Sequence, residues 1–229
     1  KVLEIIKGLK SHVGDTIPII GVIISPFSLP VIQMGFEAYL DLMYEKPVHF
    51  WNLMETNIKF GISWANRQLE AGATAICYFD PISSPTCIPP EMYRKTGHIV
   101  AERTISQING PTATHLASGL ALPIIDDLVS TGTLMVGVST DEDIGEVKKA
   151  CNGRLRVFGN LNGIAMRNWT PDEAEAAVKE AIQKAGPGGG FILSDNHGEI
   201  PWQVPDSVLF AMADAVKKWG RYPLDWITP

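Results

Sequence analysis

The feature that most constrains this chain is a regular alternation of short apolar segments with longer segments that carry helical signals. Six segments have the length and composition of buried strands, and each is followed by a helical segment; the strands are expected at 17–24, 74–80, 112–118, 133–139, 155–161 and 190–196. Strands buried on both faces of a parallel sheet have this continuous apolar character. The alternation therefore predicts an α/β fold with a helix-covered parallel sheet.

The helices are expected between these strands and in front of the first one. The clearest helix start is at Thr170, which can be an N-cap, with Pro171 at the first helical position and Glu173 completing a capping box. The other boundaries rest on apolar spacing and on glycine or proline stops. The helices are predicted at about 2–13, 36–71 in two or more pieces, 90–108, 121–130, 144–151, 171–185 and 205–219.

Two architectures accommodate such a sheet in a single domain over residues 1–229. One is a doubly wound open sheet, and the other is an eight-stranded (β/α)8 TIM-type barrel that lacks its first two units here. The leading helix favours the barrel, because a chain that starts in a helix resembles part of a longer repeat.

Composition limits the partners and the location of the chain. The net charge of −6 and the pI near 5.4 argue against a nucleic-acid partner, which needs a basic face. The uncharged stretch 17–36 is interrupted by Pro18, Pro26 and Pro30, so a membrane-spanning helix is not expected there. The three cysteines are odd in number and widely spaced, which favours the reducing cytoplasm.

Polar residues terminate all six predicted strands. In a barrel these ends meet at one face, where the chemistry of such folds is found. The plain alternative is that each residue caps a helix or holds a loop, but the recurrence at six strands predicts a shared polar mouth. Its candidate catalytic residues are Asp80, His115, Asp195 and His197, and its candidate substrate-binding residues are Ser25, Ser139, Asn160 and Asn162.

Two of these residues, His115 and His197, are also candidate metal ligands. A neutral imidazole binds divalent metals, and the alternative is a histidine pair that contacts a ligand without metal. The sequence assigns no third ligand, although Asp80, Cys87, Asp195 and Glu199 are conceivable. Asp80 follows an apolar run, so we expect desolvation to raise the pKa of its carboxyl and to suit it to proton transfer.

Several segments together resemble the uroporphyrinogen decarboxylase superfamily. They are SPFSLPVIQMG (25–35), EAGATAICYFDP (70–81), THLASG (114–119), VFGNLNG (157–163) and FILSDNHGEIPWQVP (191–205). Their order and spacing match that family over essentially the whole chain. The resemblance implies an eight-unit barrel, of which this chain is the C-terminal three-quarters.

The resemblance is closest to the branch of methylcobalamin:coenzyme M methyltransferases. That branch holds zinc with a His-x-Cys pair and a later cysteine; here His115 is present, Ala117 replaces the first cysteine, and His197 stands at the later position, as in the decarboxylases. The resemblance implies methyl transfer between a small substrate and a corrinoid (methylcobalamin), a docked corrinoid protein and zinc as a candidate cofactor. The alternatives are uroporphyrinogen decarboxylation, which needs no metal, or non-catalytic binding of a small molecule or tetrapyrrole.

Overall fold

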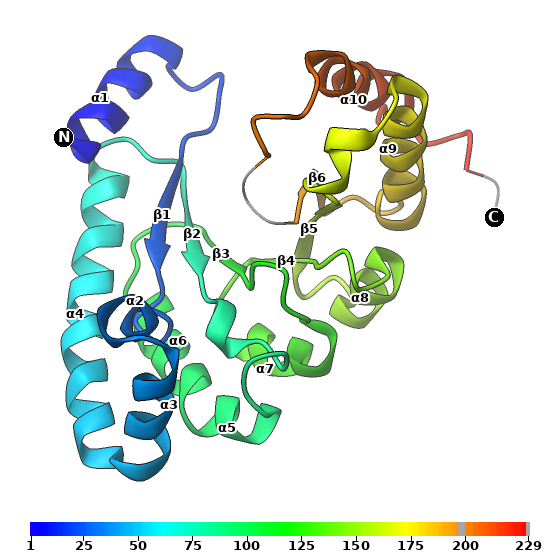
Figure 1. The fold of residues 1–229 in the computed structure, drawn as a ribbon. Coiled ribbons are helices and arrows are strands. Elements are labelled where there is room, and N and C mark those ends of the chain that lie inside the picture. Colours follow the sequence, from blue (N-terminus) through cyan, green and yellow to red (C-terminus); the bar gives the residue numbers. More distant parts are fainter. Residues whose placement is uncertain (197–199, 228–229) are drawn as a thin grey trace.

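The six predicted strands form one parallel sheet. The structure is a computed structural model that describes residues 1–196 and 200–227. The sheet order is β1-β2-β3-β4-β5-β6, and every neighbouring pair is parallel (Figure 1). The strands are β1 Ile20–Ile24, β2 Ala75–Phe79, β3 Thr112–His115, β4 Met135–Gly137, β5 Arg156–Leu161 and β6 Phe191–Asp195.

The strand order distinguishes between the two predicted architectures. A doubly wound sheet reverses its order at a switch point, because some of its connections run in the opposite direction. Here each strand pairs with the next one along the chain, and no reversal occurs among the six strands. This sequential order is the arrangement of a (β/α) barrel, so the barrel prediction is confirmed as to fold class.

The helices follow the prediction with some subdivision. The region 36–71 contains two helices and 90–108 contains another two, while the short helix α2 within 25–35 was not predicted. The capping box at Thr170 is formed as expected. The helices are α1 Val2–Val13, α2 Leu29–Met34, α3 Phe36–Glu45, α4 Pro47–Glu70, α5 Pro90–Lys95, α6 Gly97–Ile105, α7 Ile125–Ser130, α8 Ile144–Cys151, α9 Pro171–Ala185 and α10 Asp206–Trp219. Within the part of the chain that the structure describes, none of them is long and apolar enough to cross a bilayer.

The two faces of the sheet have different surroundings. In a parallel sheet, residues paired in register project to the same face. On one face Ile23, Tyr78 and Val136 are buried against the helices. On the other face Val22 is 52% exposed at one edge and Ile192 is 55% exposed at the other. We call this second face the inner face, because it corresponds to the inside of a barrel.

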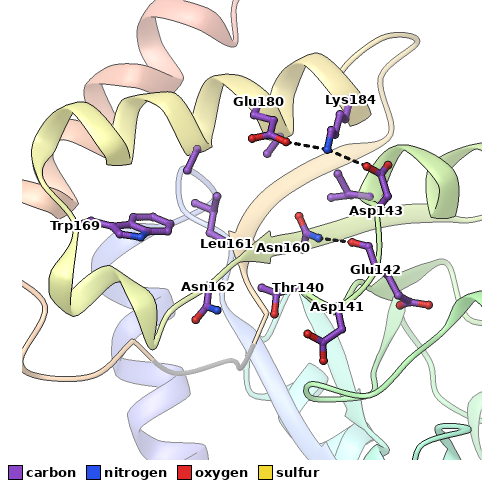
Figure 2. Close-up of a pocket in the computed structure, with 13 residues that line it drawn as sticks. Thr140, Asp141, Glu142, Asp143, Asn160, Leu161, Asn162, Trp169, Glu180 and Lys184 are labelled. Atoms are coloured by element: carbon purple, nitrogen blue, oxygen red, sulfur yellow. Dashed lines mark hydrogen bonds and ion pairs between the residues drawn. The ribbon is translucent and has the colours of Figure 1, made fainter.

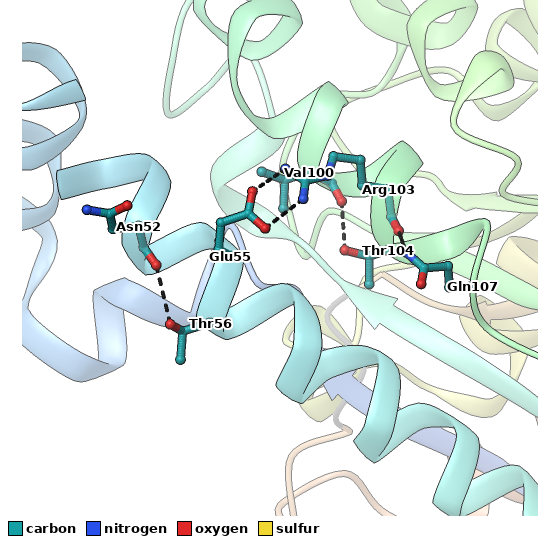
Figure 3. Close-up of polar contacts among 7 residues, drawn as sticks. All are labelled: Asn52, Glu55, Thr56, Val100, Arg103, Thr104 and Gln107. Carbon is teal, nitrogen blue, oxygen red and sulfur yellow. Dashed lines mark hydrogen bonds and ion pairs between the residues drawn. The ribbon is translucent and has the colours of Figure 1, made fainter. Parts of the chain in front are cut away.

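Helices α4 and α6, which cover the first two strands, are joined by an ion pair. Arg103 Nη1 and Nη2 donate to Glu55 Oε1 and Oε2 at 2.7 and 2.8 Å, in a bidentate arrangement (Figure 3). The Arg103 and Glu55 side chains are 40% and 47% exposed. Water and salt therefore screen the pair, and its contribution to stability is small despite the favourable geometry.

We expect a double-mutant cycle of Glu55→Gln and Arg103→Gln to give a coupling energy of about 1 kcal/mol or less. The coupling should fall when the salt concentration is raised, because both side chains are in contact with solvent. Urea denaturation at low and high salt measures it. A coupling of several kcal/mol that is independent of salt would contradict this interpretation.

Candidate functional site

Asp80 is the centre of a buried hydrogen-bond network at the carboxyl ends of β1 and β2. Its side chain is 1% exposed. Oδ1 accepts from Ser25 Oγ at 2.5 Å and from Ser28 Oγ at 2.7 Å, and Oδ2 accepts from Ser83 Oγ at 2.5 Å. The backbone N–H of Asp80 donates to the carbonyl of His115 at 2.8 Å. Asp80 thus holds the loops after β1 and β2 together, and ties them to the end of β3.

The protonation of Asp80 is governed by two opposing effects. Burial raises the pKa of its carboxyl, and the hydrogen bonds from the three serine hydroxyls oppose this increase. Burial is the larger effect, so the pKa is raised overall. The pKa of Asp80 is therefore shifted in the direction that the sequence predicts.

His115 ends β3 on the inner face, between two aromatic rings. It is paired in register with Phe79 of β2, and Gly137 of β4 is paired with Phe158 of β5. The imidazole centroid lies 5.5 Å from the Phe79 ring and 5.4 Å from the Phe158 ring. A Cβ at Gly137 would lie 2.9 Å from Phe158 Cζ, so the glycine makes room for that ring against the imidazole.

The imidazole also binds the backbone of the turn that follows it. The N–H of Ala117 donates to His115 Nδ1 at 2.8 Å. A nitrogen that accepts a hydrogen bond carries a lone pair and no proton, so the proton of the neutral ring is on Nε2. Ala117 has φ of 55°, in the left-handed region that non-glycine residues rarely adopt.

The loop after β4 is joined to β5 and to the turn after β3 through an amide and a hydroxyl. Asn160 Nδ2 donates to the carbonyls of Ser139 and Glu142 at 2.9 and 3.1 Å. Ser139 Oγ in turn donates to the carbonyl of Ser118 at 2.9 Å. These bonds connect the turn after β3 to the loop after β4 and to the carboxyl end of β5.

A pocket of about 510 Å³ lies beside these loops, between the loop after β4, the end of β5, and α9. Figure 2 shows Thr140, Asp141 and Asn162 along one side of it and Glu180 with Lys184 on the α9 side. Trp169 closes one end. The pocket is lined by Thr140, Asp141, Glu142, Asp143, Ile144, Asn160, Leu161, Asn162, Trp169, Ala177, Glu180, Ala181 and Lys184.

Most charges of this pocket are engaged within the protein. Lys184 Nζ lies 2.8 Å from both Asp143 Oδ2 and Glu180 Oε1, and these hydrogen bonds raise the pKa of Lys184. The hydrogen bond from Lys184 lowers the pKa of Asp143, which also caps the N-terminus of α8. Glu142 accepts from the N–H groups of Ala121 and Leu122. Lys184 is therefore outnumbered by carboxylates, and the lining of the pocket as a whole is acidic.

The structure distributes the predicted site residues over three neighbouring places. Ser25 belongs to the network around Asp80, His115 lies on the inner face, and Asn160 and Asn162 line the pocket. Asp80 lies outside this pocket. Asp195 ends β6, half-buried and in register with Leu161 of β5. His197 and Glu199 lie outside the described residues.

Sequence reasoning missed the residues that reach the site from loops and from α9. Ser28 and Ser83, which bind Asp80, lie three residues after Ser25 and Asp80, and their closeness to the strand ends could have indicated them. Trp169 and Lys184 gave no comparable signal, because the contact of α9 with the loop after β4 is made only in the tertiary structure.

Comparison with known proteins supports the resemblance to the uroporphyrinogen decarboxylase superfamily. The family model of uroporphyrinogen decarboxylase (URO-D) matches residues 1–219. A methylcobamide:CoM methyltransferase, MtaA, of Methanosarcina barkeri is 28% identical over 204 residues, which are 87% of this chain and 58% of that protein. The uroporphyrinogen decarboxylase of Myxococcus xanthus (strain DK1622) is 27% identical over 227 residues, which are 96% of this chain and 64% of that protein.

A solved structure has the same fold. The methyltransferase from Methanosarcina mazei superposes with a TM-score of 0.87 at 24% identity, covering 96% of this chain and 64% of that one. The chain thus spans between 58% and 64% of the length of these relatives. Because the family model matches nearly the whole chain and the fold agrees, the chain belongs to the uroporphyrinogen decarboxylase family.

Proposed function

We propose that this chain is part of a methyltransferase that moves a methyl group between a small molecule and a corrinoid. The observation that carries the proposal is His115, which lies at the end of β3 in the motif THLASG that resembles the methyltransferase branch. The similarity to the methylcobamide:CoM methyltransferase supports it. The small molecule binds at the carboxyl ends of the strands, and a separate corrinoid protein docks over it.

In the proposed reaction, the acceptor donates an electron pair to the methyl group and loses its proton to water. The bond between carbon and cobalt breaks, and its electron pair stays on the cobalt of the corrinoid. We propose that His115 acts near the methyl acceptor and that Asp80 positions the loops, and Asp195 and His197 stay further candidates for a catalytic role. Ser25 and Ser139 hold the loops, whereas Asn160 and Asn162 remain candidates for substrate contact.

Zinc is implied by the methyltransferase branch, but the described donors do not fit it. Position 117 is alanine, and Cys151, one of the three cysteines, is fully buried in the hydrophobic core. Within residues 1–196 and 200–227, no three histidine, cysteine or acidic side chains are close enough to hold an ion together. Zinc sites need three or four protein ligands, so no step of the proposed reaction passes through zinc.

The second candidate function is decarboxylation of uroporphyrinogen. Ala117 favours it, because the decarboxylases of the family need no metal and therefore no cysteine at that position. The similarity to the Myxococcus xanthus decarboxylase covers 96% of this chain. The two activities are distinguishable because they consume different substrates.

The test is anaerobic incubation of the chain with methylcobalamin and a panel of thiols, among them coenzyme M. We expect the absorbance of methylcobalamin to be lost only when both the chain and an acceptor are present. Heat-denatured chain is the control. Coproporphyrinogen formed from uroporphyrinogen, without loss of methylcobalamin, would instead establish the second candidate. Binding of either substrate without turnover would indicate the non-catalytic alternative.

A further inference from the structure

We propose that His115 is a metal-free positioning residue, which holds the turn 116–119 through Nδ1 and keeps its proton on Nε2. The inference goes beyond the proposed function, because it concerns the state of the ring whichever reaction the chain catalyses. It differs from the zinc-ligand role that the methyltransferase branch implies for this position. Three observations support it: the hydrogen bond to the ring, the packing of the turn, and the confinement of the imidazole.

The hydrogen bond fixes the tautomer of the ring. A backbone N–H can only donate, so His115 Nδ1, 2.8 Å from the nitrogen of Ala117, has to accept. A metal on Nε2 would need the lone pair there and would move the proton to Nδ1. The protonated Nδ1 would then face the Ala117 N–H, and two donors cannot form a hydrogen bond with each other. A metal on Nδ1 would compete for the lone pair that the N–H already occupies. Neither nitrogen can bind zinc while the turn keeps its conformation.

The turn is held in place from several sides. Leu116 is fully buried, and its carbonyl accepts from the N–H of Gly119 at 2.9 Å. The carbonyl of Ser118 accepts from Ser139 Oγ. A Cβ on Gly119 would overlap the side chain of Ser84. This packing keeps Ala117 in the left-handed region, which is unfavourable for a residue with a Cβ, and directs its N–H to His115.

The imidazole is also restricted from moving to a new position. It is 5% exposed and lies between the rings of Phe79 and Phe158. A Cβ at Gly137 would lie 3.5 Å from His115 Cδ2, so the edge of the ring is close to the backbone of β4. Because buried side chains pack as tightly as organic crystals, a rotated ring would need its neighbours to shift.

The first experiment is long-range ¹H–¹⁵N NMR of uniformly labelled chain, with and without one equivalent of zinc. We expect His115 to show an unprotonated Nδ1 and a protonated Nε2, and zinc to leave both signals unchanged. The spectrum of His115→Asn identifies the signals by their loss. A protonated Nδ1, or signals of His115 that shift on addition of zinc, would overturn the proposal.

A pair of substitutions tests the positioning role. In His115→Asn, Oδ1 can accept from the Ala117 N–H much as Nδ1 does, whereas His115→Ala removes the acceptor. We expect hydrogen exchange at the Ala117 amide to accelerate about fivefold in His115→Ala, since a hydrogen bond contributes about 1 kcal/mol, and to stay near the wild-type rate in His115→Asn. The exposed His12, changed to alanine, is the control. Equal acceleration in both His115 variants would contradict the proposal.

Metal analysis after equilibration with zinc and dialysis completes the test. We expect wild type, His115→Ala, His115→Asn and His12→Ala to retain the same amount of zinc. A zinc ligand at position 115 would instead give one zinc per chain that is lost in both His115 variants and kept in His12→Ala. That result would overturn the proposal whether or not methyl transfer is observed.

Discussion

Asp80→Ala is expected to lower the free energy of unfolding by about 3 to 5 kcal/mol. The carboxylate accepts from three buried serine hydroxyls at 2.5 to 2.7 Å, and each hydrogen bond to a charged group contributes about 1.5 to 3 kcal/mol. The contributions do not add fully, because a released hydroxyl can turn to another acceptor. Urea denaturation followed by circular dichroism measures the change.

Two further variants show whether the loss of stability in Asp80→Ala comes from the lost hydrogen bonds. In Asp80→Asn the amide keeps the size of the side chain and retains an oxygen acceptor, while the hydroxyls can turn to accept from its nitrogen. We expect that variant to lose less than about half as much stability as Asp80→Ala. Asp41→Ala, at an exposed position of α3, should change the stability by about 0.5 kcal/mol or less. Equal losses in both Asp80 variants would contradict the network described above.

The stability of wild type relative to Asp80→Asn is expected to depend on pH. Burial raises the pKa of Asp80 in the folded state above its ordinary value of about 3.9. A pKa that is raised in the folded state stabilises that state at pH values where the carboxyl is protonated. This stabilisation is lost as the pH rises through the pKa of the folded state. The stability of wild type relative to Asp80→Asn should therefore decrease as the pH is raised from about 4 toward neutrality. An increase over that range would show that the hydrogen bonds outweigh burial.

His115→Ala is expected to lower kcat/KM for the proposed methyl transfer by about 100-fold, because displacement of a site by about 1 Å can cost that much. The substitution removes the ring between Phe79 and Phe158 and also frees the turn at Ala117. Initial rates of methylcobalamin loss with a saturating acceptor, and with the acceptor varied, give kcat and KM separately.

His115→Asn divides this loss into two parts. The variant keeps an acceptor for the Ala117 N–H but has no Nε2–H, so its activity should lie between those of wild type and His115→Ala. The difference between the two variants reports the positioning of the turn, and the remaining loss reports the imidazole itself. His12→Ala should retain wild-type activity. An active His115→Ala would remove His115 from the proposed site, even if the chain proves to be a methyltransferase.

The sequence by itself determined the elements and their order. Buried parallel strands produce continuous apolar runs, and the Thr170 capping box starts α9 where predicted, because both signals depend on local geometry and burial. The expected strands at 112–118 and 133–139 are shorter in the structure, ending at His115 and Gly137. Leu116 and Val138, directly beyond those ends, are buried apolar residues outside the strands, and hydrophobicity alone does not distinguish a buried loop from a strand.

The tertiary structure alone decided how the polar residues are connected. The sequence indicated Asp80, His115 and Asn160 as strand-end residues with a common role, but their partners come from separate loops: the serines around Asp80, the N–H of Ala117, and the carbonyls of Ser139 and Glu142. A hydrogen bond depends on positions within a few tenths of an ångström. Those positions follow from the packing of helices and loops far apart in the chain, which no local pattern encodes.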